Sequence, residues 1–593
     1  MKDFVKMTLA VICGLFIMGI IGIILLSGFI GALASSNSAK PVLPRSGVLK
    51  IDMSKIIIKE QASTINDPTS LLKNNYITPI GIWNAVQAIN TAAADPAVKL
   101  IYLKTDGAFA GMAQLEEFRK ALDNFRKSGK AIVSYMESPT TGSYYLASVA
   151  DKVYMSSYSG SGPMITGVAT QMFFLKDILD RFGVNVQLIR HGKYKSAGEM
   201  FIKNAPSKEN LEQTQEMINS IWESMADEIA EKRNIESTAL SALIDNLALE
   251  SPQDMIEHKL VDELVTKDEL KEKLAVLEGE QSFKSSRLIR FSDYVTAKTS
   301  PDYKAKKKIA IIYADGEITE NEDIKAISGD RFAKIVADVD ADSSVKAVVL
   351  RVSSPGGSVL ASDKIRKQLD KLGNDKLLVA SYGNYAASGG YWISNNCSKI
   401  FSDKTTLTGS IGVFSMIPDF SKTAKDILKV GVANVGSNEH SDMYSLMKPL
   451  DEKEQAYIQK GVEKIYEEFV GNVAEGRSLR TSYVDSIAQG RVWTGADALK
   501  INLVDEIGTL EDAVNYAVAT IDGTTDLTKW NVTAYPKPMT EFESIMAAFG
   551  QMNQEEDVLA KTPFKSIVKT FKDWNYQTSE RFYARMPYEY SIK

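Results

Sequence analysis

The sequence contains little cysteine and little histidine, which excludes several common ways of building a stable exported protein or a metal site. Its 593 residues include two cysteines and three histidines. Cys13 lies inside a long apolar run and Cys397 lies far from it, so we expect no intrachain disulfide. His191, His258 and His440 are isolated, and without an HExxH or CxxC motif the sequence predicts no metal site. The net charge of −6 provides no basic surface, so we expect no nucleic-acid partner.

Charged residues are also missing from Met7 to Ala34. About 20 apolar residues suffice to cross the hydrocarbon core of a bilayer. We therefore predict a transmembrane anchor within residues 1–34, with residues 7–34 in the lipid. Lys2 and Lys6 favour a cytoplasmic N-terminus and export of everything that follows. The alternative is a cleaved signal peptide ending at Ala32-Leu33-Ala34, although the apolar run is long for one.

The remainder contains one unit twice. The stretch VKLIYLKTDGAFAGMAQLEEFR (98–119) matches VKAVVLRVSSPGGSVLASDKIR (345–366) at a constant offset of 247 residues. In both stretches an apolar, β-branched run is followed by an amphipathic segment of helical period. Repeated strand–helix alternation predicts an α/β protein built from parallel βαβ units.

These observations predict the domain organisation. We expect an anchor (1–34), a spacer (35–46), a first α/β unit (47–295), a linker (296–307), a second α/β unit (308–521) and a C-terminal extension (522–593). We expect the aromatic-rich extension to have no counterpart in the first copy. Packing against the body is its expected role, with subunit or membrane contacts as alternatives.

The two copies differ at positions that could perform chemistry. Ser388 lies in YAASGGYW, between small residues, where the first copy has Gly142. With histidines so scarce, a lysine is the remaining candidate base for such a serine, and Lys195 lies in GKYKSAGE of the first copy. Ser410 in TLTGSIGVF faces Pro163 of the first copy, so its hydroxyl too belongs to the second unit alone. A turn role for either serine and a surface role for the lysine are the alternatives.

A glycine pair shows the same asymmetry. Gly356 and Gly357 in SSPGGS directly follow the apolar strand KAVVLRV, whereas the first copy has Phe109 and Ala110. Backbone N–H groups at such a turn can stabilise an oxyanion, and losing one donor costs about 3 kcal/mol in acyl-transfer enzymes. The first copy therefore lacks both the serine and the glycine pair, as expected if these residues take part in the same reaction.

Several ordered motifs resemble one family. YAASGGYWIS, LTGSIG, SSPGGS, HGKYKSAGE and GRVWTGADALKINLVDEIG are similar to the signal peptide peptidases of the long, duplicated SppA type. The resemblance covers about residues 47–521 and implies two tandem domains of the ClpP/crotonase fold. It assigns the nucleophile to Ser388, the general base to Lys195 and a lysine-binding hydroxyl to Ser410. It places the oxyanion hole in the backbone around Gly357 and Gly389, beside Gly356.

The resemblance also implies an activity and a location. Members use a Ser-Lys dyad to degrade cleaved signal peptides and other hydrophobic peptides at the outer face of the bacterial plasma membrane. They form homotetramers and need no cofactor. Two alternatives remain: a crotonase-type enzyme acting on acyl thioesters, and a membrane scaffold that has kept only the fold.

Overall fold

The computed structural model describes residues 41–61, 77–107, 110–284, 286–299, 305–321, 326–537 and 582–586, together with Gly14 and Met18. No helix within these ranges is long and apolar enough to cross a membrane. Apart from Gly14 and Met18, the predicted anchor lies outside the described residues. The same holds for Phe109.

The first unit is built on a six-stranded parallel sheet with the order β8-β6-β5-β4-β1-β9. Its strands are β1 (Gly47–Asp52), β4 (Val98–Lys104), β5 (Ile132–Met136), β6 (Lys152–Ser156), β8 (Glu263–Val265) and β9 (Leu288–Arg290). A small separate parallel pair is formed by β2 (Ile56–Lys59) and β3 (Thr78–Gly81). Within the six-stranded sheet, each crossover between neighbouring strands includes helix, as the alternating pattern predicts.

The second unit repeats this order as β20-β16-β15-β13-β10-β21. Its strands are β10 (Lys307–Asp315), β13 (Val345–Ser354), β15 (Leu377–Ala387), β16 (Lys399–Ser402), β20 (Glu506–Ile507) and β21 (Trp530–Tyr535). Two further strands extend the sheet beside the C-terminal end of β15: β17 (Leu407–Gly409) pairs with the last three residues of β15, and β19 (Val492–Thr494) pairs with β17. The predicted α/β class and the duplication are both confirmed by this repeated strand order.

One expectation about the extension is wrong. β21 pairs in parallel with β10, the first strand of its unit, just as β9 pairs with β1. The start of the extension therefore has a counterpart in the first copy. The two sequences do not reveal this correspondence, because edge strands pair through their backbones. Strands as different as β9 (LIR) and β21 (WNVTAY) can therefore occupy equivalent positions.

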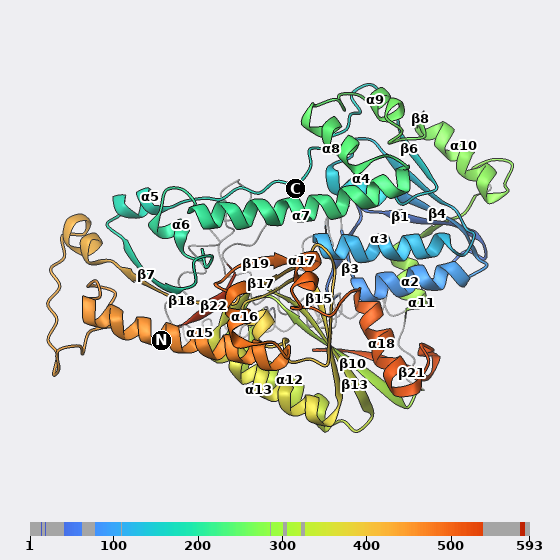
Figure 1. Cartoon of the computed structure of the whole chain (residues 1–593). Coiled ribbons are helices and arrows are strands. Elements are labelled where there is room, and N and C mark those ends of the chain that lie inside the picture. The colour runs from blue at the N-terminus through green and yellow to red at the C-terminus, as the bar shows by residue number, and fades with distance from the viewer. Residues whose placement is uncertain are drawn as a thin grey trace, which may run out of the picture.

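Helices cover the sheets and join the two units (Figure 1). Those of the first half are α2 (Ile82–Ala94), α3 (Met112–Arg126), α4 (Thr141–Ala147), α5 (Lys176–Arg181), α6 (Glu199–Ile202), α7 (Lys208–Arg233), α8 (Ser237–Asp245), α9 (Pro252–Glu257), α10 (Lys267–Glu278) and α11 (Phe291–Lys298). Those of the second half are α12 (Gly329–Ala341), α13 (Val359–Asp375), α14 (Gly389–Trp392), α15 (Glu452–Gly476), α16 (Thr481–Ile487), α17 (Gly495–Lys500) and α18 (Leu510–Asp522). The described residues also include a π-helical turn (Thr423–Ile427) and a 3₁₀ turn (Leu527–Lys529). One apolar core includes Ile89 and Phe118 of the first unit with Val349 and Val514 of the second.

A third sheet crosses the boundary between the copies. Its order is β12-β11-β14-β22-β18-β7. Its strands are β7 (Asn185–His191), β11 (Ile318–Thr319), β12 (Ile327–Ser328), β14 (Gly356–Ser358), β18 (Val413–Asp419) and β22 (Tyr583–Arg585). β7 belongs to the first copy and runs antiparallel to β18 of the second along its whole length. The segment that follows β7, which contains Lys195, is thereby carried to the second unit.

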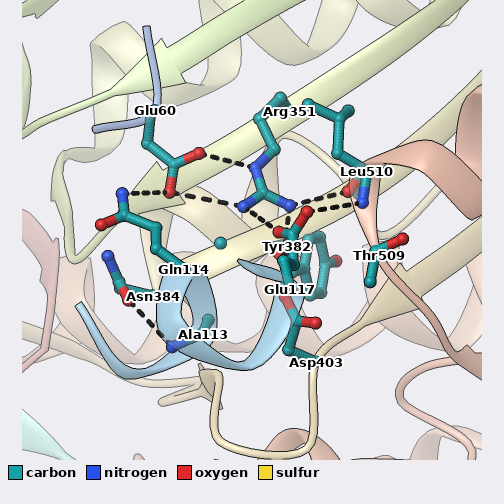
Figure 2. A network of polar contacts seen from close by, with 12 residues as sticks. Glu60, Ala113, Gln114, Glu117, Arg351, Tyr382, Asn384, Asp403, Thr509 and Leu510 are labelled. Carbon is teal, nitrogen blue, oxygen red and sulfur yellow. Dashed lines mark hydrogen bonds and ion pairs between the residues drawn. The ribbon is translucent and has the colours of Figure 1, made fainter. Parts of the chain in front are cut away.

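A buried ion network also links the copies (Figure 2). The Arg351 guanidinium on β13 donates to Glu60 Oε2 at 2.7 Å and to Glu117 Oε1 at 2.5 Å. All three side chains are at most 2% exposed. Gln114 supports Glu60, donating to Oε1 at 3.0 Å, and Leu510 N donates to Glu117 at 3.1 Å. Two carboxylates of the first copy thus neutralise one arginine of the second.

Candidate active site

Ser388 lies where strand β15 ends and the short helix α14 begins. Its backbone has φ 55° and ψ −112°, outside the regions that L-residues usually occupy. Such conformations cost about 1–3 kcal/mol and persist only where the surroundings enforce them. Here Ser388 N donates to Gly409 O at 2.8 Å, and Trp392 N donates to Ser388 O at 2.8 Å. The strand–turn–helix connection therefore holds the side chain in one place.

Lys195 reaches this serine from the other copy. Its Nζ lies 2.9 Å from Ser388 Oγ, 3.0 Å from Ser410 Oγ and 3.1 Å from Ser410 O. All three residues are 0% exposed. The lysine predicted from the first copy therefore lies within hydrogen-bonding distance of both serines predicted from the second.

The surroundings of Lys195 favour its neutral form. Burial lowers the pKa of the Lys195 ammonium well below that of an ordinary lysine. The three oxygens around Nζ belong to hydroxyl and carbonyl groups, so no carboxylate among them offsets the loss of hydration. A neutral amine beside a serine hydroxyl is the arrangement that a general base requires.

The loop that carries Lys195 is fixed on both sides. Gln213, on helix α7, donates to Tyr194 O and to Ser196 Oγ, each at 3.0 Å, and accepts from Val492 N at 3.2 Å. Tyr194 N donates to Gln489 O at 2.9 Å. Because Gln213 bonds to both copies, it sets the lysine loop relative to the second unit.

Gly490 allows the close approach of this loop. Its φ is +77°, and a Cβ placed there would lie 2.5 Å from Lys195 Cβ. Sequence reasoning missed both Gln213 and Gly490. Gln213 lies among polar residues on a long helix, and Gly490 opens the motif GRVWTG, which we used only as a mark of resemblance.

The glycines expected to form an oxyanion hole lie close to Ser388. A Cβ on Gly356 would fall 2.6 Å from Gly389 N, so the two backbones approach closely, and Gly356 has φ +97°. Gly356 N donates to Ser354 Oγ at 3.2 Å. Gly357 is the next residue of the same strand, β14. Gly356 and Gly389 therefore lie against one another beside the serine, and Gly357 follows Gly356 along the strand.

The first copy has no comparable site in the part that the structure describes. Gly142 lies in the first turn of α4, the helix that corresponds to α14, and offers no hydroxyl. A Cβ placed on Gly142 would have Leu115 Cδ1 as its nearest neighbour, at 3.6 Å.

His440 is isolated in sequence but not in space. Its Nδ1 lies 3.1 Å from Glu454 Oε1, and Asp451 completes a small acidic group. Lys448 Nζ also binds that Glu454 oxygen, at 3.0 Å, so a cation already neutralises the carboxylate. The histidine belongs to a surface ion cluster next to the start of α15.

Comparison with known proteins agrees with this picture. Residues 124–280 and 371–522 match peptidase family S49, once in each copy. The chain belongs to this family. Protease 4 of Haemophilus influenzae is 35% identical over 84% of the chain and 83% of its own length, and Protease 4 of Salmonella typhi is 33% identical over 84% and 82%. The chloroplastic serine protease SPPA of Arabidopsis thaliana is 28% identical over 81% of the chain and 71% of its own length.

Family membership makes this S49 chain a serine peptidase. Its two matched segments, together with relatives named Protease 4 and SPPA over most of its length, agree with the long, duplicated SppA type. A solved ClpP1 mutant of Listeria monocytogenes aligns with 34% of the chain and 93% of its own length, at 15% identity and a TM-score of 0.23. That score is too low to support any statement about the fold.

Proposed function

We propose that the chain is a membrane-anchored Ser-Lys endopeptidase that degrades cleaved signal peptides and other hydrophobic peptides at the outer face of the bacterial plasma membrane. The single observation that carries the proposed chemistry is the 2.9 Å contact between Lys195 Nζ and Ser388 Oγ in a fully buried setting. In the roles proposed here, Ser388 is the nucleophile, Lys195 the general base and Ser410 the hydroxyl that orients the base.

The reaction has two stages. Neutral Lys195 accepts the Ser388 proton as Oγ attacks the substrate carbonyl carbon, and then gives that proton to the leaving amine. Lys195 next removes a proton from water, which hydrolyses the acyl-enzyme ester and regenerates the serine. Backbone N–H groups at Gly357 and Gly389, beside Gly356, are proposed to stabilise the negative oxygen that forms in each stage.

The apolar surroundings of the site support a hydrophobic substrate. Next to the lysine loop lies a buried cluster that includes Leu179, Val186, Phe201, Phe414 and Met416, contributed by both copies. These side chains pack against one another and against Tyr583 of β22, so an apolar peptide side chain would gain this environment only by taking the place of Tyr583. Binding energy here scales with the apolar area removed from water.

Peptide hydrolysis tests the chemistry. The detergent-solubilised full-length chain is expected to cleave a hydrophobic fluorogenic peptide, whereas Ser388→Ala falls to background. An acyl thioester of similar hydrophobicity should not be turned over faster than in buffer. Thioester turnover without peptide cleavage would favour the crotonase-type alternative, and no turnover of either substrate would favour a scaffold.

Location and assembly need their own measurements. We propose that residues 7–34 hold the chain in the plasma membrane with the N-terminus in the cytoplasm, and that four chains assemble. The lack of charge from Met7 to Ala34 supports the anchor. Full-length protein should fractionate with membranes and be digested by a protease added outside spheroplasts. Light scattering in detergent should give the mass of four chains.

A further inference from the structure

One turn of the second unit is held by a buried carboxylate of the first. Glu116, on helix α3, accepts through Oε1 from Lys404 N at 3.0 Å. Its Oε2 accepts from Thr405 N at 3.1 Å and from Thr405 Oγ1 at 2.9 Å. Glu116 is 8% exposed and Thr405 is 4% exposed. Both oxygens of this carboxylate therefore bind the Lys404–Thr405 turn, and the reaction proposed above does not use the carboxylate.

This turn leads directly into the proposed site. Strand β17 begins shortly after it, and Thr408 Oγ1 of β17 donates to Ala386 O of β15 at 2.7 Å. Gly409, the last residue of β17, accepts the Ser388 N–H at 2.8 Å. Ser410 follows and binds the lysine base at 3.0 Å. A shift of the turn along the strand would therefore move both serines relative to the lysine.

A second contact from the first unit supports the same turn. Lys404 Nζ binds Glu228 Oε1, on helix α7, at 2.9 Å. Glu228 also accepts from Tyr145 Oη at 2.6 Å and pairs with Arg119 Nη1 at 3.5 Å. The turn is therefore held at its backbone by Glu116 and at its lysine side chain by Glu228.

The equivalent of Glu116 in the second unit has a different partner. At the repeat offset of 247 residues, Glu116 corresponds to Asp363 on α13. Asp363 pairs with Lys367 of its own helix at 2.6 Å. The contact between Glu116 and the turn is therefore, like the lysine–serine pair, one that the first unit makes with the second.

The charge of this carboxylate is costly at its position. Burial raises the pKa of Glu116 to about 7, the Glu228 carboxylate contributes to the rise, and the hydrogen bonds from the turn oppose it. The other charged or titratable groups that face Glu116 are Lys120 on α3, Tyr145 on α4, and Asp403 and Lys404 at the turn. Glu116 therefore changes its charge near neutral pH.

The charged form is the one that binds the turn at both oxygens. The two backbone N–H groups of the turn donate to different oxygens of Glu116. A protonated carboxyl carries a hydrogen on one of these oxygens, and an amide has an NH₂ group in its place, so one buried N–H then faces a donor. Charge-assisted hydrogen bonds are also about twice as strong as bonds between neutral groups. Loss of the charge should therefore loosen one side of the turn.

We propose that Glu116 is a positioning residue of the proposed reaction: its carboxylate fixes the turn before β17 and thereby holds both serines in place for the lysine base. This inference rests on the proposed function. The first unit then contributes twice to the site, with the base itself and with the carboxylate that aligns the serines. Neutral Glu116 should leave the dyad assembled but less well aligned, which lowers kcat more than it changes KM.

Glu116→Gln tests this inference in the full-length chain, because glutamine has the size of glutamate without its charge. Well above the Glu116 pKa of about 7, kcat for a hydrophobic fluorogenic peptide should fall about tenfold with little change in KM. Below that pKa the wild-type carboxyl is itself neutral, so the kcat values of the two proteins should converge. Asp123→Asn is the matched control. It removes a carboxylate of α3 that binds Lys232 rather than the turn, and should keep the wild-type kcat.

The melting temperature separates positioning from support of the fold. Because the pKa of Glu116 is raised from 4.5 to about 7 in the folded state, this group makes wild type less stable as the pH rises through that range. Glutamine does not titrate, so above about pH 7 the melting temperature of Glu116→Gln should equal or exceed that of wild type. A residue that only supports the fold predicts the opposite, a lower melting temperature.

The turn can be varied in the same way. Thr405→Val keeps the shape of the side chain and the backbone N–H groups but removes the hydroxyl that donates to Glu116. Its kcat should therefore fall, and by less than that of Glu116→Gln. Thr405→Ser keeps the hydroxyl and should match wild type. An equal fall of kcat in Thr405→Ser and Thr405→Val would overturn the inference.

The outcomes distinguish this inference from the proposed function. If Ser388→Ala is inactive and Glu116→Gln equals wild type at every pH, the inference fails and the proposed function stands. A decrease of kcat in Glu116→Gln that is the same at every pH, or that comes with a lower melting temperature, assigns Glu116 to general support of the fold and also overturns the inference. Fluorogenic hydrolysis that persists in Ser388→Ala overturns the proposed function and the inference together.

Discussion

The two α/β units share a strand order, but equivalent residues differ in their burial and in their contacts. Lys104 on β4 keeps 26% of its side chain exposed and lies 3.9 Å from Asp52 of its own unit. Its equivalent, Arg351 on β13, is fully buried and binds two carboxylates of the other unit. Similarly, the second unit has Ser388 where the first has Gly142. Within the residues that the structure describes, the duplication therefore provides one candidate site composed from both units, and no second one in the first unit.

The largest expected effect comes from the serine. Ser388→Ala should lower kcat/KM for a hydrophobic peptide by about 10⁴-fold or more, because the reaction loses its nucleophile. The change removes one oxygen from a packed site, so the melting temperature should stay within a few degrees. Steady-state hydrolysis and circular dichroism measure the two quantities.

The first unit provides the control for this comparison. Gly142→Ser places a hydroxyl at the equivalent position, where the structure leaves room for a Cβ. In the Ser388→Ala background it should restore no hydrolysis, because no described lysine lies against Gly142 as Lys195 lies against Ser388. Restored hydrolysis would mean that the first unit has a site of its own.

Lys195 should give the next largest effect and a characteristic pH dependence. Lys195→Ala is expected to lower kcat/KM by about 10³-fold or more. In wild type, kcat/KM should rise with pH as the amine loses its proton and then level off, with a midpoint well below the ordinary lysine pKa because burial lowers it. The residual kcat/KM of Lys195→Ala should not show this rise with pH.

The low pKa of Lys195 also affects stability, with a definite sign. Since the folded state holds fewer protons on this group than the unfolded state, folding stability increases as the pH rises from the lowered pKa toward the ordinary lysine value. Lys195→Met removes this contribution. Urea unfolding of both proteins across that pH range should show that the free energy of unfolding increases less with pH in the variant than in wild type.

The arginine comparison predicts unequal effects on stability. Arg351→Met leaves Glu60 and Glu117 buried without their partner, and should destabilise the chain by about 3–5 kcal/mol. The matched change Lys104→Met removes a partly exposed contact and should cost no more than about 1 kcal/mol. Thermal unfolding measures both. Equal effects would contradict the claim that Arg351 joins the two units.

This arginine effect should shrink in acid. Burial raises the pKa of Glu117, although the Arg351 guanidinium opposes that rise. Without Arg351 the buried Glu117 carboxylate binds a proton more readily, so the folded variant regains stability as the pH falls through the raised pKa of Glu117. When unfolding is measured from neutral to mildly acidic pH, the difference in the free energy of unfolding between wild type and Arg351→Met should become smaller.

The smallest effect is expected at Gln213, which positions the lysine loop without touching the serine. Gln213→Ala should reduce kcat about 10-fold while changing KM little, because the lysine shifts but the peptide cleft is intact. Gln215→Ala, on the exposed side of the same helix, is the matched control and should match wild type. A large rise in KM would show that Gln213 contributes to substrate binding instead.

The sequence was informative where the two copies could be compared and less so elsewhere. Duplicated motifs predicted the repeated α/β units and placed Lys195 and Ser388 in one proposed site, and the structure brings these side chains to 2.9 Å. The partners Glu60 and Glu117 of Arg351 could not be predicted, because charges that meet across a packed interface have no spacing rule in the chain. Strand β22 was missed because three residues that pair mainly through their backbone leave no periodic pattern.

The most direct test of the composite site is complementation between two inactive chains. Ser388→Ala and Lys195→Ala are each purified, and a mixed oligomer is made by co-expression with two different tags. Because Lys195 meets Ser388 of its own chain, the mixed oligomer is predicted to stay at background in fluorogenic peptide hydrolysis. Clear recovery of hydrolysis in the mixed oligomer, absent from either variant alone, would contradict a dyad completed within one chain.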